Sequence, residues 1–250
     1  MHSGLPSTAS PSFRRGPSPA ASASPVKTRL GLFAFGAILA LSGCWLLLPE
    51  LIQPKTIGLP QDAAGAAAAS AHKSEALLAA RIGAIRGDLW AAAAFTDSSL
   101  LWLDRAALLD RANAGRIARA RSNAESALAL APINGEAWLF LAALPSDAPS
   151  GAEGNVAALL QMSYFTAPND LTLAELRLAR VATSSALADK DIQEFIKNDI
   201  RRILAYRPHL KSAIIAAYRN AWPQNRPLLE GLAADVDPAF AQSLRSASQK

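Results

Sequence analysis

The feature that most constrains this chain is an apolar stretch from Leu30 to Leu48, nineteen residues without a charge. As an α-helix, this stretch is about 28 Å long, which is close to the thickness of a bilayer's hydrocarbon core. The preceding segment has no acidic residue and four basic ones, Arg14, Arg15, Lys27 and Arg29. Because basic flanks stay in the cytoplasm, we expect a single transmembrane helix over 30–52, with the residues after about 50 on the far side.

The same stretch has a second interpretation. Leu41-Ser42-Gly43-Cys44 resembles the lipobox of bacterial lipoproteins, in which a signal peptidase cuts before the cysteine. Cys44 is then the lipidation site, and 30–52 is a lipoprotein-type signal. The long segment before the stretch, and the apolar Trp45–Leu48 after the cysteine, favour the uncleaved span. Both interpretations place the same domain on the same side of the membrane.

Residues 1–29 are predicted to be a disordered cytoplasmic tail, because proline, serine and alanine dominate residues 1–26 and little apolar surface is clustered there. The tail holds four of the basic groups, so the net charge of +5 leaves +5 − 4 = +1 for the remainder. A nearly neutral domain argues against nucleic acid as a partner. The local cluster Arg116, Arg119 and Arg121 is therefore interpreted as the solvated side of a helix.

The residues after the anchor are predicted to form a linker, 53–70, and one all-α domain, 71–247. The composition is 51% hydrophobic but only 6% aromatic, with much alanine, which favours closely packed helices over sheets. The first helix of the domain is expected to carry an apolar stripe formed by Leu78, Ile82, Ile85 and Leu89. Gly83 and Gly87 are expected to let a neighbouring helix come close.

Further along the chain, capping residues and prolines predict where helices begin and end. Leu100 to Leu109 is a second apolar segment that leads through Asn113-Ala114-Gly115, either as a break or as a kink, into a helix over 116–131. The stripe of that helix comprises Ile117, Ala120, Ala124 and Leu128. Pro132 ends it, and Asn134 caps a helix over 135–144.

Three more helices are predicted in the C-terminal half. Ser150 with Glu153, and Thr172 with Glu175, have capping-box spacing for helices that end near 165 and 183. Lys190 to Tyr206 is the clearest amphipathic segment, with one apolar face formed by Ile192, Phe195, Ile196, Ile200, Ile203 and Leu204. Short helices separated by Pro223, Pro227 and Pro238 complete the chain.

The junction between residues 120 and 144 resembles tetratricopeptide repeats. Ala120, Ala124 and Ala127 fall on the small or apolar positions of a repeat's second helix, and Pro132 falls on the terminal proline. Trp138, Leu141 and Ala142 match the Trp, Leu and small-residue positions of the next first helix. Similar junctions recur at Pro168 and Pro208. Pro168 lies 36 residues after Pro132, and Pro208 lies 40 residues after Pro168, whereas the ideal repeat has 34 residues. The resemblance implies degenerate repeats: an array of antiparallel helix pairs that binds peptides or partner proteins.

No catalytic, cofactor or metal signature is recognisable in the sequence. His2, His72 and His209 lack the close spacing of metal ligands. Glu125-Ser126 matches the catalytic dipeptide of some lytic transglycosylases, which cut peptidoglycan, but it lies within the repeat-like helix and the glycine-rich motifs expected after it are absent. An enzyme of this kind is the least favoured interpretation. We expect a protein that is not an enzyme and needs no cofactor.

These expectations combine into one functional hypothesis. The chain is expected to be a single-pass protein of the bacterial inner membrane, with a cytoplasmic N-terminus and a periplasmic helical-repeat domain. That domain would act as a scaffold or adaptor for envelope or inner-membrane proteins, with surface polysaccharide assembly or export as one setting. A lipoprotein adaptor lipidated on Cys44 is the alternative. The oligomeric state and the partner do not follow from the sequence.

Overall fold

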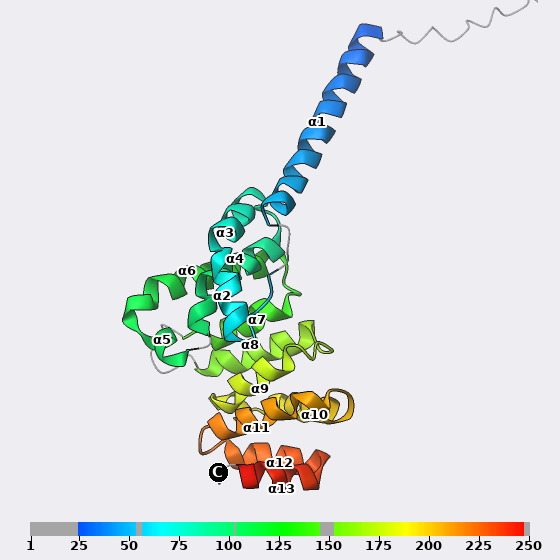
Figure 1. Cartoon of the computed structure of the whole chain (residues 1–250). Helices are drawn as coiled ribbons and strands as arrows, with labels where there is room; N and C mark the ends of the chain where they lie inside the picture. Colours follow the sequence, from blue (N-terminus) through cyan, green and yellow to red (C-terminus); the bar gives the residue numbers. More distant parts are fainter. Residues whose placement is uncertain (1–24, 54–56, 103, 146–152, 248–250) are drawn as a thin grey trace, which may run out of the picture. The chain divides into compact units, whose positions relative to one another are not determined.

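The computed structural model describes residues 25–53, 57–102, 104–145 and 153–247, and every regular element within them is a helix (Figure 1). The chain divides into two compact units, residues 1–44 and 45–250. The α-helices are α1 (Pro25–Ile52), α2 (Ala63–Ala71), α3 (Lys73–Ile82), α4 (Gly87–Trp102), α5 (Arg105–Leu109), α6 (Ala114–Leu130), α7 (Gly135–Ala143), α8 (Glu153–Thr166), α9 (Ala174–Ala182), α10 (Lys190–Tyr206), α11 (Lys211–Asn220), α12 (Arg226–Val236) and α13 (Pro238–Ala247). Three short 3₁₀ helices join them: η1 (Arg111–Asn113), η2 (Ser185–Ala188) and η3 (Pro208–Leu210).

The described part of the first unit is the N-terminal part of α1. Within the described residues, the segment Val26–Ile52 is the one helix long and apolar enough to cross a membrane, with a mean hydropathy of 2.1. The helix ends at Ile52, as expected, but it begins at Pro25, so the predicted tail is wrong for residues 25–29. Proline is tolerated at a helix start because its missing N–H has no helical partner there. The tail prediction for residues 1–24 lies outside the described residues.

Helix α4 is the central element of the second unit. It contacts α2, α3, α5 and α6, and twelve of its sixteen residues are buried, including four consecutive alanines, Ala91–Ala94. Alanine side chains let neighbouring helices approach closely, while Phe95 fills the remaining space against Phe140 at a ring-centroid distance of 5.3 Å. A helix buried on all sides carries no amphipathic stripe, so its sequence gives no periodic signal.

The predicted stripe over 78–89 is wrong. The chain leaves the helical path at Gly83, where α3 ends, and α4 begins at Gly87, so the four apolar residues do not share one face. Leu78 and Ile85 are exposed, whereas α3 buries Ala76, Ala79 and Ala80. A Cβ atom added to Gly87 would lie 2.7 Å from the Ala127 carbonyl oxygen of α6. The close approach expected at Gly87 is therefore present, but it occurs at a helix start.

The predicted linker is also corrected, because residues 63–71 form α2. Asp62 caps this helix, and its carboxylate accepts a hydrogen bond from the Gly65 N–H at 2.6 Å. A run of alanines after a capping aspartate has high helix propensity, and packing on α4 stabilises this short helix further. Residues 57–61 of the predicted linker have no regular secondary structure.

The junction after α6 agrees with the sequence. Helix α6 ends at Leu130, before Pro132, and the Asn134 side chain accepts from the Ala137 N–H at 3.0 Å, which caps α7. At Asn113-Ala114-Gly115 the sequence leaves open a break or a kink. The structure has a break, because the 3₁₀ helix η1 ends at Asn113 and α6 begins at Ala114. Ser150 lies outside the described residues. Thr172 does not cap α9, because Leu173 occupies the cap position and the Thr172 hydroxyl donates to Asp170.

From α7 onward the helices contact one another in two rows. Helix α7 contacts α9, α9 contacts α11, and α11 contacts α13. In the second row α8 contacts α10, and α10 contacts α12. One continuous apolar core runs from α4 through both rows. Helices α9, α10 and α11 therefore contact the helices two places before and after them, whereas α12 and α13 also pack directly on each other.

Candidate binding groove

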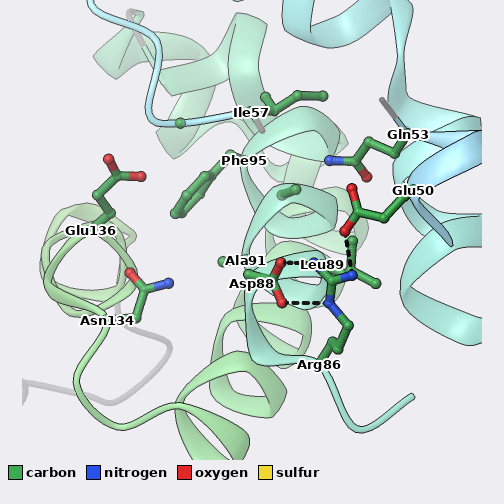
Figure 2. A pocket seen from close by; sticks show the side chains of 12 residues that line it. Glu50, Gln53, Ile57, Arg86, Asp88, Leu89, Ala91, Phe95, Asn134 and Glu136 are labelled. Atoms are coloured by element: carbon green, nitrogen blue, oxygen red, sulfur yellow. Dashed lines mark hydrogen bonds and ion pairs between the residues drawn. The ribbon is translucent and has the colours of Figure 1, made fainter. Parts of the chain in front are cut away.

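A cavity of about 250 Å³ lies in the second unit between α4, α7 and the last turn of α1 (Figure 2). Its apolar floor is formed by Leu89 and Phe95 of α4, and the Glu136 and Asn134 side chains border it on the opposite side. Ile57 and Gly58, the first residues of the non-helical segment Ile57–Gln61, also line it. We refer to this cavity together with the path of Ile57–Gln61 as the binding groove.

One wall of the groove is an ion triad in which Arg86 binds two carboxylates. The Arg86 guanidinium donates hydrogen bonds to Glu50 of α1 and to Asp88 of α4. The hydrogen bond from Arg86 lowers the pKa of Asp88, and the two carboxylates together raise the pKa of Arg86. Arg86 and Asp88 are therefore charged at neutral pH, and the triad links the end of α1 to the start of α4.

Glu136, on α7, forms the opposite wall. Burial raises the pKa of this carboxyl, repulsion from Asp170 raises it further, and a hydrogen bond from the Leu59 N–H partly opposes both effects. Gly58 lies so close that an added Cβ would contact both Glu136 carboxylate oxygens at 3.4 Å. The half-buried Glu136 carboxyl thus holds the backbone N–H group of Leu59, in a segment without regular secondary structure.

The segment Ile57–Gln61 is packed into the second unit by buried side chains and a side-chain hydrogen bond. Leu59 and Pro60 are buried, and the Gln61 side-chain amide donates to the Thr172 carbonyl at 3.2 Å. A second cavity of about 490 Å³ lies along the same segment, against α2. The groove is thus larger than the short segment that occupies it.

The charges of the groove define what it can bind. Three carboxylates, those of Glu50, Asp88 and Glu136, face one guanidinium, that of Arg86, so the lining carries a formal charge of −2. Phe95 and Leu89 supply apolar contact area. Such a lining suits an extended segment with an apolar side chain and a basic one.

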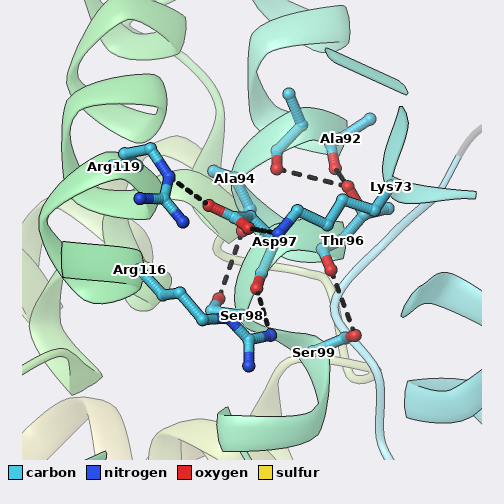
Figure 3. Close-up of polar contacts among 10 residues, drawn as sticks. Lys73, Ala92, Ala94, Thr96, Asp97, Ser98, Ser99, Arg116 and Arg119 are labelled. Atoms are coloured by element: carbon cyan, nitrogen blue, oxygen red, sulfur yellow. Dashed lines mark hydrogen bonds and ion pairs between the residues drawn. The ribbon is translucent and has the colours of Figure 1, made fainter. Parts of the chain in front are cut away.

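A second polar cluster surrounds Asp97, a buried residue of α4 (Figure 3). Its carboxylate forms ion pairs with Lys73 of α3 and, at 3.5 Å, with Arg119 of α6. Arg116 donates to the Asp97 backbone carbonyl at 2.8 Å. The cluster therefore connects three helices. The neighbouring Thr96, Ser98 and Ser99 hydroxyls all donate to carbonyls of α4 itself.

The solvated-face interpretation of the three arginines is thus wrong in part. Arg116 and Arg121 are half-buried and donate to the carbonyls of Asp97 and Pro145, while Arg119 is exposed. Nothing in the local sequence distinguishes these arginines from solvated ones, because their acceptors lie 19 and 24 residues away.

A third polar cluster is fully buried and joins α7 to α10. The Arg177 guanidinium lies 4.4 Å from the centre of the Tyr164 ring and donates to Ser163. Ser163 in turn donates to the Gly135 carbonyl at 2.9 Å. The Tyr164 hydroxyl donates to Asp199 at 2.9 Å, and burial raises the pKa of Asp199 to about 6. Because it is closed to solvent, this cluster stabilises the packing of the helices.

The residues selected from the repeat resemblance lie in the packing interior. Ala120, Ala124, Ala127, Leu141 and Ala142 are buried. Trp138 is half-buried, and its indole N–H donates to the Pro132 carbonyl at 2.8 Å, with Pro132 itself exposed. None of these residues lines the groove. Of the groove residues, the sequence pattern indicates Asn134 as a helix cap and Leu89 as part of an apolar stripe, and it gives no sign of the roles of Glu50, Arg86 and Glu136.

The remaining candidates do not line the cavity of about 250 Å³. Cys44 is exposed on α1. Glu125 is exposed on α6, and Ser126 donates to the Ser122 carbonyl of its own helix. His72 contacts Glu75 at 2.7 Å, and His209 lies in η3. Among the described residues no group of three His, Cys, Asp or Glu side chains is arranged to hold a metal ion.

No protein-family model, curated protein or solved structure matches this chain.

Proposed function

We propose that this protein is a membrane-anchored adaptor whose binding groove holds an extended segment of another protein. The observation that carries the proposal is the segment Ile57–Gln61, which has no regular secondary structure and borders the two cavities of about 250 and 490 Å³. It is held by its backbone at Glu136 and by one side-chain hydrogen bond at Thr172. A groove that binds one non-helical segment of this chain has the chemistry to bind another.

The setting of the adaptor is proposed from the anchor. The apolar helix α1 and the basic residues before it favour a single-pass protein of the bacterial inner membrane with a periplasmic domain. The partners would be envelope or inner-membrane proteins, for example those that assemble or export surface polysaccharide. A partner segment with a basic side chain complements the charge of −2 in the groove.

The two rows of helices from α7 to α13 support the proposal of tetratricopeptide-like repeats. In such arrays each helix contacts the equivalent helix of the next repeat, as α7, α9 and α11 do here. The alanines of α6 that correspond to small repeat positions are buried against neighbouring helices. The long η2 connection between α9 and α10 departs from the short turns of regular repeats, in keeping with a degenerate array.

Site-specific photocrosslinking in intact cells tests the adaptor function. A photoreactive amino acid at Asp88, in the groove, should form an adduct with an envelope protein, whereas the same residue at Leu109, which is exposed after the far end of α4, should not. Adding Glu136→Lys should abolish the adduct, because it reverses one charge of the groove. Glu125→Lys, an exposed glutamate on α6, is the matched control. Adducts that are insensitive to Glu136→Lys would contradict the proposal.

Topology and processing need separate measurements. Protease treatment of spheroplasts should degrade the domain, since the proposal places it outside the cytoplasm. Mass spectrometry of the intact protein separates the span from the lipoprotein alternative: loss of residues 1–43 with lipid on Cys44 would replace the transmembrane anchor by a lipid anchor. Glu125→Gln should leave peptidoglycan turnover unchanged if the protein is not an enzyme.

A further inference from the structure

Within the second unit, large apolar side chains are exposed in the last turns of α1 and in the segment that follows α3 into α4. Leu47 and Leu51 of α1 are exposed, and α3 and the following turn expose Leu78 and Ile85. The turn comprises residues 83–86 and connects α3 to α4; we call it the α3–α4 turn. Its tip carries Ile85, which is 62% exposed although an apolar side chain gains by burial.

Three contacts hold this turn against α1. The Trp45 indole N–H donates to the Ile82 carbonyl at 2.9 Å, at the end of α3. Pro49 is packed against Gly83, where an added Cβ would lie 3.1 Å from the proline ring. Arg86 closes the turn by its ion pair with Glu50. The α3–α4 turn is therefore fixed at the level of residues 45–50, where the apolar stretch of α1 ends.

Because the α3–α4 turn contacts residues 45–50 of α1, the depth of these residues in a bilayer determines whether the turn is surrounded by lipid or by water. Trp45–Leu48 are the last residues of the apolar stretch, so they lie at the boundary between hydrocarbon and headgroups. Tryptophan is enriched at that boundary. Residues that contact Trp45 and Pro49 lie at the same depth or slightly outside it.

We propose that the α3–α4 turn is a lipid-binding element, with Ile85 inserted into the bilayer interface and Leu78 at its edge. The proposal rests on the proposed transmembrane anchor and adds a second membrane contact to it. Because the turn touches α1 and the membrane together, it limits how the domain can tilt relative to the bilayer. The sequence pattern does not predict this element, because the helical spacing of Leu78 and Ile85 predicts that both are core residues.

Depth-dependent fluorescence quenching tests the proposal on the full chain. The chain, with Cys44→Ser, is reconstituted into phosphatidylcholine–phosphatidylglycerol vesicles that contain brominated lipid. An environment-sensitive probe is attached after Ile85→Cys or, as the matched control, after Leu109→Cys, which is 64% exposed and lies beyond the far end of α4. With sixteen residues, α4 is about 24 Å long, and the two probes are attached beyond its opposite ends. The Ile85 probe should be quenched at least about twofold more than the Leu109 probe.

A second pair and an anchor probe separate the outcomes. Leu78→Cys and Leu100→Cys are both 50% exposed and should differ in the same direction by a smaller factor. A probe after Leu41→Cys reports whether α1 is inserted. Quenching at Leu41 without quenching at Ile85 overturns the lipid contact and leaves the anchor intact. Absence of quenching at Leu41 overturns the anchor itself. An Ile85 probe that is shielded from water but not quenched by brominated lipid would show a protein partner, and would also overturn the proposal.

Discussion

Helices α4 and α10 bury their side chains in opposite ways. Helix α10 is amphipathic: Ile192, Ile196, Ile200 and Ile203 are buried on one face, while Lys190, Asn198 and Arg201 face solvent. Helix α4 is buried on nearly all sides, and it includes the buried Thr96, Asp97, Ser98 and Ser99. The periodic helix was predicted with its bounds, Lys190 to Tyr206, and the buried helix was not.

This difference teaches where stability should be concentrated. A residue of α4 touches neighbours in several directions, because α2, α3, α5 and α6 surround it. Helix α10 contacts other helices on one face, and its opposite face is exposed to solvent. Truncations of equal size should therefore cost more in α4 than at the edge of the α10 stripe.

The largest expected effect is that of Phe95→Ala in α4. Phe95 is buried between α4 and α7, so truncation should lower the free energy of unfolding by about 3 to 5 kcal/mol. The matched variant Phe195→Ala removes a half-buried ring from α10 and should cost about 1 to 2 kcal/mol. Denaturant unfolding of the full chain in detergent, followed by circular dichroism, measures both. Equal losses of unfolding free energy in the two variants would contradict the expectation that truncation costs more in α4 than in α10.

A pH-dependent effect is expected from Asp199, the buried acid of α10. Burial raises its pKa from 3.8 to about 6 in the folded protein. The unfolded chain therefore ionises first, and the contribution of Asp199 to stability is present below pH 3.8 and is lost as the pH rises to about 6. The loss corresponds to roughly 3 kcal/mol.

Asp199→Asn checks this expectation. Asparagine does not titrate and keeps an oxygen for the Tyr164 hydroxyl. The variant should gain stability relative to the wild type as the pH rises from 3.5 to 6.5, as measured by unfolding at several pH values. Parallel stability curves for the two proteins would show that burial of Asp199 does not govern this range.

Truncation of Trp138 should have an intermediate effect. Its ring is half-buried against the core and its N–H binds the Pro132 carbonyl, so Trp138→Ala should cost about 2 kcal/mol, less than a fully buried tryptophan. Trp138→Phe retains most of the packing and should recover part of that loss. A change below about 0.5 kcal/mol for Trp138→Ala would remove Trp138 from the packing of the α6–α7 junction.

The smallest expected changes in stability are those of alanine substitutions at two glycines, Gly87 and Gly231, and they have opposite signs. In Gly87→Ala, the new methyl group would lie 2.7 Å from backbone oxygen of α6, so a loss of about 1 to 2 kcal/mol is expected. In Gly231→Ala, on α12, the methyl group meets nothing within 4 Å, and the higher helix propensity of alanine should stabilise by about 0.5 to 1 kcal/mol. Thermal unfolding of both variants measures the opposite signs. A neutral Gly87→Ala would contradict the tight packing of α4 on α6.

Local signals predicted much of the fold. The Asn134 cap, the stripe of α6 and the bounds of α10 follow from residues within four positions of one another. The groove was not predicted, because Glu50, Arg86 and Glu136 lie far apart in the sequence and are common surface residue types. The α3–α4 turn misled the pattern analysis, since Leu78, Ile82, Ile85 and Leu89 keep helical spacing across a break at Gly83.

By itself, the sequence determined what depends on neighbouring residues: an apolar helix long enough to cross a membrane, an all-helical remainder, and helix ends at caps and prolines. The tertiary structure alone decided which apolar residues are covered, how Arg116 and Arg177 are satisfied, and that Ile57–Gln61 lies in a groove. The physical reason is that burial and ion pairing depend on which distant segments meet, whereas helix formation is largely set within a few turns of the chain.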